Sequence, residues 1–336
     1  MKQLHFDSIG GASGDMVLGA LASVGADLEA VQTELRKLPV DELAIVSEAA
    51  KDQGLAGVRV TVRVPAEGHH HRGLKTISGM IEESDLPART KELSLKVFTR
   101  LAEAEARVHG TTPDRIHFHE VGAMDSIVDI VGACHALALL GVDAVSFAPL
   151  PLGQGTVECA HGTYPVPAPA TRLLLEGSPV TRTGQTCELV TPTGAALLTT
   201  WRTTETVPSG SLVKQSGYGL GHRALEGRPN ALRATLYETE EVVADTCLVM
   251  ECQVDDTVPE LLGTLMTRLL EAGALDVFTT AVQMKKQRPG TLLTVLCRPD
   301  TRHALLDTLF RGSTTFGVRE YLTRRTMLDR RFEEVD

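Results

Sequence analysis

Three adjacent histidines, His69, His70 and His71, stand in a polar segment flanked by glycine, residues 67–73. Neutral imidazole binds nickel, zinc, copper and cobalt, so three histidines in a turn could capture such an ion without a preformed cage. A solvated polar loop explains the same residues equally well. The triplet alone therefore leaves metal capture and a plain surface turn as alternatives.

A second group of metal-type side chains lies further along the chain. His117 and His119 fall in a segment that we expect to be extended, where alternate side chains project to the same side. Glu120 follows, and Asp125 and Asp129 lie one turn apart on an expected helix. Imidazole and carboxylate ligands together suit divalent transition metals, so the group predicts a metal site. The alternative is that the two aspartates are a helix cap and a solvated residue.

A glycine-rich turn, Gly10 to Gly14, separates Asp7 from Asp15, between the first expected strand and the first expected helix. Backbone N–H groups of such a turn can hold an anion together with the helix N-terminus. The turn has neither a Walker A lysine nor a G-x-G-x-x-G pattern, so a tight turn is an equally good interpretation. Residues 217–222 are a weaker glycine motif, and residues 191–194 are typical of a helix start with proline.

Charged residues near the C-terminus suggest a nucleotide site. Asp255 and Asp256 end an expected strand, and a basic turn, residues 285–290, joins the next two strands. Paired carboxylates hold Mg²⁺ or Mn²⁺, and lysine and arginine bind polyphosphate, so together they predict a metal–nucleotide site. Each group alone is typical of a solvated turn. The candidate nucleotide-binding residues of the turn are Lys285, Lys286, Arg288 and Gly290.

The elements that position these residues divide near residue 240. The pattern of apolar residues over 1–240 predicts a mixed α/β domain, which includes the histidine-rich loop. A strong helix is expected to be capped by Asp125 or Ser126 and closed by Gly141, with His135 as a structural histidine of the core. Residues 149–170 are rich in proline and glycine and predict a long structured loop or a hinge.

The last third of the chain alternates strands and helices more clearly. Residues 241–336 follow the order βαββαβ, which predicts a ferredoxin-like unit. Its first helix is expected over Pro259 to Glu271. The fold class is therefore α/β (α+β), with an N-terminal mixed α/β domain and a C-terminal ferredoxin-like domain.

Composition excludes several classes of protein. The chain has 336 residues, 43% of them hydrophobic, and 33 basic against 43 acidic residues give a net charge of -10. Such a charge opposes binding to nucleic acid and to anionic membranes, and no apolar stretch approaches the roughly 20 residues of a membrane span. Nothing marks the N-terminus for export, which predicts a cytoplasmic protein. The six scattered cysteines indicate neither a disulfide framework nor a tetrathiolate zinc site; most are expected to be buried.

Long blocks of the sequence resemble the LarC nickel-insertion family from residue 4 to about residue 325. Members of that family act in making the nickel-pincer nucleotide cofactor of lactate racemase and related enzymes. The resemblance implies a lyase, a nickel chelatase, that places nickel into pyridinium-3,5-bisthiocarboxylic acid mononucleotide in a CTP-dependent reaction assisted by Mn²⁺ or Mg²⁺. The blocks are FDSIGGASGDMVLGAL (6–21), HFHEVGAMDSIVDIVG (117–132), PLPLGQGTVECAHGTYPVPAPAT (149–171), TPTGAALL (191–198) and QMKKQRPGTLLTVLC (283–297).

The resemblance assigns roles to the candidate residues. It implies that the histidine triplet captures nickel, which is the substrate, and passes it to a site containing His117 and His119. Insertion releases a proton from the ring carbon of the mononucleotide, and Glu120 or Asp125 is the candidate acceptor. CTP and Mn²⁺ are expected at the C-terminal domain, either to drive the step or to organise the substrate. Their candidate ligands are Asp255, Asp256 and the basic turn.

Two further expectations complete the interpretation. Family members usually continue beyond the last expected strand, so the chain is expected to be shortened at its end, which bears on CTP use. A homo-oligomer is expected. The alternative function, from another class, is a nickel storage or delivery protein without turnover. It predicts bound nickel but no new covalent product.

Overall fold

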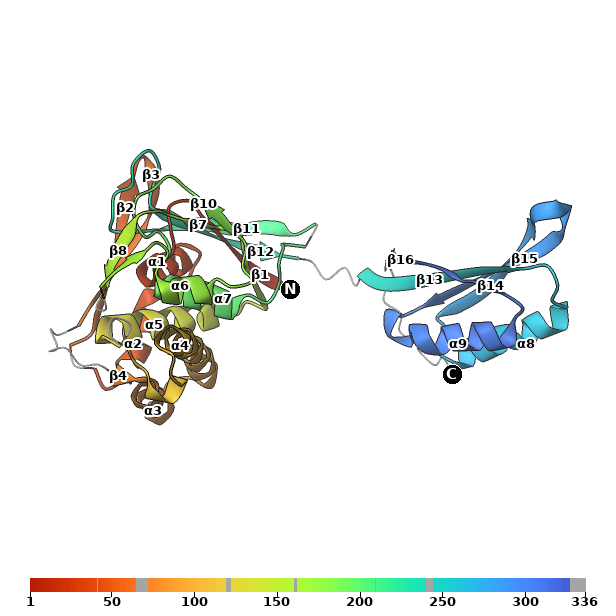
Figure 1. Cartoon of the computed structure of the whole chain (residues 1–336), viewed down its shortest axis with the longest axis horizontal. Coiled ribbons are helices and arrows are strands. Elements are labelled where there is room, and N and C mark those ends of the chain that lie inside the picture. Colours follow the sequence, from red (N-terminus) through yellow and green to blue (C-terminus); the bar gives the residue numbers. More distant parts are fainter. Residues whose placement is uncertain are drawn as a thin grey trace, which may run out of the picture. The chain divides into compact units, whose positions relative to one another are not determined.

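The chain divides into two compact units, Met1–Glu240 and Glu241–Asp336 (Figure 1). The computed structural model describes residues 1–40, 42–64, 72–118, 122–159, 162–208, 210–239 and 244–326. Each unit combines helices and strands around a sheet and a core of its own, so the chain has the mixed α/β character expected from its sequence.

A six-stranded mixed sheet organises the N-terminal unit, in the order β2-β3-β11-β12-β1-β6. β1 runs parallel to β6, and β11 runs parallel to β3, whereas the other neighbours are antiparallel. Because side chains alternate along a strand, Leu4 and Phe6 of β1 are fully buried in the core while His5 and Asp7 lie half-buried on the other face. The strands are β1 (Lys2–Ser8), β2 (Ala44–Asp52), β3 (Leu55–Arg63), β6 (Ala144–Phe147), β11 (Leu212–Leu220) and β12 (Ala231–Glu238).

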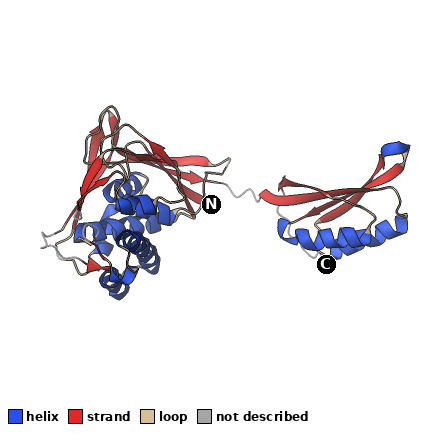
Figure 2. Cartoon of the chain, viewed as in Figure 1, coloured by secondary structure: helices blue, strands red, loops and turns tan. Residues whose placement is uncertain are grey.

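Helices of this unit gather on one side of the sheet (Figure 2). α1 packs on β3, β11 and β12, and α5 packs against α1, α2, α4 and α7. Other helices enclose α5, and this explains why it is apolar almost all round, with Ile127, Ile130 and Val131 fully buried. The helices are α1 (Gly14–Ser23), α2 (Leu28–Leu35), α3 (Leu74–Glu83), α4 (Ala88–His109), α5 (Met124–Leu140), α6 (Pro169–Leu174) and α7 (Pro192–Trp201), with a 3-10 turn at Pro113–Arg115.

None of the helices in the described ranges has the length and apolar character that crossing a membrane requires.

Three short ladders complete the N-terminal unit. β4 (Arg72–Gly73) pairs with β5 (His117–Phe118), β7 (Leu150–Leu152) with β10 (Val180–Arg182), and β8 (Thr156–Cys159) with β9 (Gly162–Pro165). The prediction of a long loop or hinge over residues 149–170 is therefore wrong for much of that segment. Proline did not prevent strand formation here because β7 pairs with β10 only at one edge and β9 ends at its proline.

The C-terminal unit has a four-stranded antiparallel sheet of order β14-β15-β13-β16, with α8 and α9 on one face. Met250, Leu265, Val295 and Leu305 form the centre of its core. The elements follow the βαββαβ order expected from the sequence. They are β13 (Ala244–Val254), α8 (Pro259–Glu271), β14 (Asp276–Gln283), β15 (Pro289–Cys297), α9 (Arg302–Gly312) and β16 (Arg319–Thr326), with 3-10 turns at Lys285–Gln287 and Pro299–Thr301.

The six cysteines all lie within the described ranges, and none of them forms a disulfide bond. Cys134, Cys247, Cys252 and Cys297 are buried, as expected for small apolar side chains. Burial raises the pKa of the Cys134 thiol to about 12, so this cysteine stays protonated at neutral pH.

Candidate functional site

Two helix N-termini bring three carboxylates of the N-terminal unit together. Asp15 lies in the first turn of α1, Asp125 lies in the first turn of α5, and Asp129 follows one turn later. α1 reaches α5 closely at Gly14, where an added Cβ would lie 3.1 Å from both Cβ and Oδ2 of Asp129. The same added Cβ would lie 3.1 Å from Cγ2 of Thr193, at the start of α7. Glycine at this position therefore allows three helices to converge.

We refer to Asp15, Asp125 and Asp129 as the acidic cluster. Within it, the environment of Asp129 disfavours the charged form of the carboxyl. Burial raises its pKa well above the ordinary value, and the negative charges of Asp15 and Asp125 raise it further. Its Oδ1 atom is buried and has no hydrogen-bond partner among the described residues. An ionised Asp129 thus lacks the compensation that buried charges usually have, which is typical of a carboxylate retained for binding or catalysis.

His222 joins the cluster from the loop after β11. Its Nε2 atom lies 3.5 Å from Oδ2 of Asp15 and 3.1 Å from the carbonyl oxygen of Val60. The hydroxyl of Ser13 donates a hydrogen bond to Asp15 Oδ1. The sequence motif around residues 217–222 is a weak signal, and its histidine was not among the predicted site residues. β11 lies beside β3 and packs on α1, and this brings the histidine that follows β11 next to the start of α1.

One short ladder joins the two segments that carry the predicted metal-binding histidines. In the pairing of β4 with β5, Arg72 lies opposite Phe118 and Gly73 opposite His117. A Cβ on Gly73 would lie 2.9 Å from the carbonyl oxygen of Ile116, so the two strands depend on glycine for this approach. His117 is exposed. His69, His70, His71, His119 and Glu120 lie outside the described residues, and the ladder consists of their described chain neighbours.

The chain returns from this ladder directly to the acidic cluster. Arg72 donates a hydrogen bond of 3.2 Å to the carbonyl oxygen of Gly122, and α5 begins two residues later. The prediction that Asp125 or Ser126 caps α5 is wrong, because Ala123 occupies the N-cap position without a side-chain hydrogen bond. Asp125 instead accepts a 2.7 Å hydrogen bond from the backbone N–H of Ser126. Asp125 is exposed, so its carboxylate is accessible to a ligand.

His135 is a buried residue of α5, as predicted. Its Nδ1 atom lies 2.8 Å from Oγ1 of Thr90, and burial lowers its pKa. Because Thr90 belongs to α4, this contact joins α4 to α5, in keeping with the structural role predicted for His135.

The glycine-rich turn forms backbone hydrogen bonds and close contacts with other segments of the N-terminal unit. The N–H groups of Ile9 and Gly10 both donate to the carbonyl oxygen of Ala231, and that of Ala12 donates to Leu189. A Cβ on Gly11 would lie 2.1 Å from the carbonyl oxygen of Leu189. These contacts favour the tight-turn interpretation, because two N–H groups of the turn, those of Gly10 and Ala12, are already bonded within the protein.

Across the described residues, no three histidine, cysteine, aspartate or glutamate side chains lie close enough together to hold a metal ion. Of the residues predicted for the nickel site, the structure describes His117, Asp125 and Asp129. These three side chains do not lie close enough together to bind one metal ion.

The predicted nucleotide-binding residues meet at one end of the C-terminal sheet. Asp255 directly follows β13, and its Oδ2 atom lies 3.4 Å from Nη1 of Arg288 in the basic turn. Asp256 accepts a hydrogen bond from Oγ1 of Thr314. A Cβ on Gly290 would lie 2.4 Å from Sδ of Met284, so glycine lets the turn close. Lys285 and Lys286 are exposed beside this pair.

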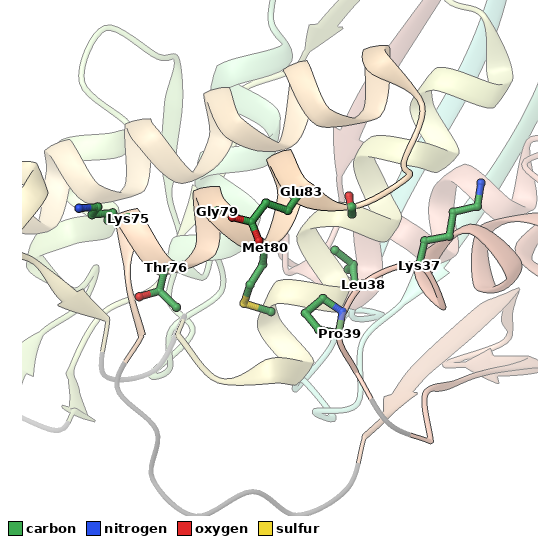
Figure 3. Close-up of a pocket in the computed structure, with 9 residues that line it drawn as sticks. Lys37, Leu38, Pro39, Lys75, Thr76, Gly79, Met80 and Glu83 are labelled. Carbon is green, nitrogen blue, oxygen red and sulfur yellow. The ribbon is translucent and has the colours of Figure 1, made fainter.

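Among the cavities of the described N-terminal residues, two have the volume of a site for a small organic ligand and are lined by charged side chains. One, of about 610 Å³, lies between α3 and the segment after α2 (Figure 3). The other, of about 750 Å³, lies at His5, Asp7 and Arg233. There Asp7 interacts with His5 and accepts hydrogen bonds of 3.1 and 2.8 Å from Arg233, which together hold its pKa below the ordinary value despite burial. The charges of that second cavity therefore largely neutralise one another.

The sequence places this chain among the nickel insertion proteins. The chain belongs to the nickel insertion protein family, whose sequence profile it matches over residues 4–336. It carries the LarC blocks described above throughout that range.

Individual relatives are similar over nearly the whole chain. A protein of Staphylococcus saprophyticus, named pyridinium-3,5-bisthiocarboxylic acid mononucleotide nickel insertion protein, is 40% identical over 99% of this chain and 84% of its own length. A protein of the same name from Akkermansia muciniphila is 44% identical over 98% of this chain and 84% of its own length.

A solved structure is similar to part of the chain. It is described as the apo form of the C-terminal domain of a cyclometallase involved in the synthesis of the NPN cofactor of lactate racemase. It is 44% identical, covers 26% of this chain and 62% of its own, and has a TM-score of 0.26.

Proposed function

We propose that this chain inserts nickel into pyridinium-3,5-bisthiocarboxylic acid mononucleotide in a reaction that depends on CTP and Mn²⁺. The product would be the nickel-pincer cofactor of lactate racemase-type enzymes. The observation that carries the proposal is the pairing of β4 with β5 in a chain of this family. It pairs Arg72 and Gly73, which follow the histidine triplet in the sequence, with Phe118 and His117, and Arg72 also contacts Gly122 just before α5.

The chemistry requires nickel delivery and a proton acceptor. Ni²⁺ forms one bond to the ring carbon and two to the thiocarboxylate sulfurs, and the ring carbon loses its proton to a base. We assign nickel capture to His69, His70 and His71, and nickel positioning to His117 and His119 with Asp129. Glu120 or Asp125 accepts the proton. Asp125 suits this role because it is exposed at the acidic cluster.

The C-terminal residues fit a metal–nucleotide complex. Asp255 and Asp256 offer the oxygen ligands that Mn²⁺ and Mg²⁺ prefer, and the exposed basic turn offers cations for a triphosphate. Bound there, Mn²⁺ with CTP would supply either a driving force for insertion or a scaffold that organises the substrate. We assign the triphosphate to Lys285, Lys286 and Arg288, with Gly290 shaping the turn. A cytoplasmic homo-oligomer is part of the proposal.

The direct test is mass spectrometry of the mononucleotide after incubation with the protein, Ni²⁺ and Mn²⁺, with and without CTP. A gain of nickel mass that requires CTP is the expected result. Nickel bound to the protein without any nickel-containing product would contradict the proposal and favour the alternative, a storage or delivery protein.

The basic turn gives a separate prediction. Replacing both Lys285 and Lys286 with glutamine should weaken CTP binding about tenfold or more, because each lysine removed is a charge-assisted contact to phosphate. Isothermal titration calorimetry of Mn²⁺–CTP measures this. Arg311→Gln is the matched control, since Arg311 lies on α9 of the same unit and pairs with Asp307. Equal affinity in the double variant and the control would remove the lysines from the site.

A further inference from the structure

The cavity beside α3 is built from one face of that helix. Thr76, Gly79, Met80 and Glu83 have the spacing of a single helix face, and all four line the cavity. Ile77 and Ile81 occupy the opposite side of α3 and are fully buried. The helix is thus held against the core by one face and offers the other to a ligand. Across the cavity lies the segment that follows α2, with Leu38 and Pro39.

Gly79 leaves this cavity open. It lies in the middle of α3, where glycine is a poor helix former compared with alanine. An added Cβ would meet no atom within 4 Å, and the residue does not have a positive φ. Neither a close approach nor a turn therefore explains glycine here. What the missing side chain does provide is free space over the middle of the cavity wall.

Two lysines border the cavity. Figure 3 shows Lys75 and Lys37 at opposite sides of the view, with Met80, Leu38 and Pro39 between them. Lys75 is exposed, and Lys37 lies 2.7 Å from Glu34 while keeping 39% of its side chain exposed. Apolar side chains and the carboxylate of Glu83 lie in the middle, and a lysine lies at each side. This arrangement matches a ligand with a flat ring and anionic groups at its ends.

We propose that this cavity binds the mononucleotide substrate, with its pyridinium ring over Gly79 and Met80 and its anionic groups on Lys75 and Lys37. The inference rests on the proposed function and names the place where the substrate of that reaction sits. By its name the substrate has one ring, two thiocarboxylates and a ribose phosphate, which supply the flat centre and the separated anions. A volume of about 610 Å³ is within the range of small-ligand sites.

The position of α3 in the chain fits this assignment. α3 begins directly after β4, the strand that pairs with the His117 segment. A substrate held by Lys75 and Thr76, in the first turn of α3, would therefore lie close along the chain to the residues proposed to deliver nickel.

Glu83 is the one acidic residue among the described residues that line the cavity. It opposes an anion in its own vicinity and so directs the anionic groups toward the lysines. Glu83→Gln is consequently expected to strengthen binding of the metal-free substrate, whereas Lys75→Gln is expected to weaken it.

The experiment measures the Kd of the full chain for the mononucleotide by calorimetry, without nickel and without CTP. Lys75→Gln should raise the Kd about tenfold, as expected for one charged contact. Gly79→Leu should raise it at least about tenfold by filling the space the ring needs. Gly263→Leu is the matched control: Gly263 lies within α8, and its added Cβ also meets nothing within 4 Å. Both leucine variants should keep or raise the Tm, since leucine favours helix.

Wild-type Kd values for Lys75→Gln and Gly79→Leu would overturn the assignment, and so would an equal loss in Gly263→Leu. Gly79→Ala repeats the test with the smallest change if Gly79→Leu lowers the Tm. Failure of the site and failure of the function are separable. If the wild-type chain inserts nickel but the variants bind the mononucleotide as tightly as the wild type, only the proposed site is wrong. If the variants change the Kd as expected but the wild-type chain never forms the nickel product, the site is supported and the proposed function is wrong.

Discussion

Replacing His117 and His119 together with alanine is expected to abolish nickel insertion, with a loss of more than about 100-fold in product formation. Imidazole nitrogen is the donor that holds Ni²⁺ beside its acceptor, and alanine offers none. Nickel-containing mononucleotide, quantified by mass spectrometry at fixed time, measures the loss. His303→Ala is the control, because His303 is an exposed histidine of α9 in the other unit.

This loss is expected without unfolding. His117 is exposed, and exposed substitutions usually change the free energy of unfolding by no more than about 0.5 kcal/mol. The adjacent Phe118 supplies the packing of β5, with its ring centroid 6.5 Å from that of Phe98. The Tm of the single variant His117→Ala should therefore match that of the wild type. Unimpaired insertion by the double variant would remove both histidines from the nickel site.

The C-terminal unit was the most predictable part of the chain. The expected helix at Pro259 to Glu271 is confirmed at both ends, because proline marks its start and the turn at Gly273 follows its end. Apolar residues such as Met250 and Val295 lie at the centres of its strands, and helices and short turns separate the strands, so the order of elements could be recognised from the sequence.

Helix ends in the N-terminal unit could be predicted where a side chain makes the cap. Asp27 accepts hydrogen bonds from Glu29 and Ala30 at the start of α2, and Gly141 adopts the left-handed conformation that ends α5. The start of α5 could not be predicted in this way. Its N-cap makes no side-chain bond, and close packing around Gly122 and Gly14 sets its position instead.

The candidate site was predictable only in part for the same reason. Asp125 and Asp129 were recognisable because they lie one turn apart on a single helix. Asp15 and His222 come from distant parts of the sequence, and the packing of α1 between the sheet and α5 brings them together. Gly79 has no functional group, so its proposed role could be recognised only from the cavity that α3 borders.

Asp129→Asn is expected to raise the Tm at neutral pH while lowering nickel insertion by about 100-fold or more. The folded protein holds the Asp129 carboxyl in a buried position beside Asp15 and Asp125, which raises its pKa. Ionising it at neutral pH therefore opposes folding, and an asparagine of nearly the same shape carries no charge. Thermal unfolding with a chelator present, so that no metal contributes, measures the change in Tm.

The pH dependence follows from the direction of this shift. A raised pKa means that the folded state binds a proton more readily than the unfolded state, so wild-type stability falls as pH rises from the ordinary aspartate range through the folded pKa. The asparagine variant lacks this titration. Its advantage in Tm should be largest at neutral pH and should vanish as pH falls toward about 4. Asp85→Asn, at an exposed position after α3, is the matched control.

A variant that is more stable yet inactive would show that the chain keeps an ionisable Asp129 at a cost to folding, as binding and catalytic sites often do. The opposite result has an equally definite meaning. A Tm that falls at neutral pH would indicate that Asp129 stabilises the convergence of α1, α5 and α7 and is a structural carboxylate. Retained insertion in that variant would then leave Asp125, Glu120 and the histidines as the remaining candidates for metal binding and proton transfer.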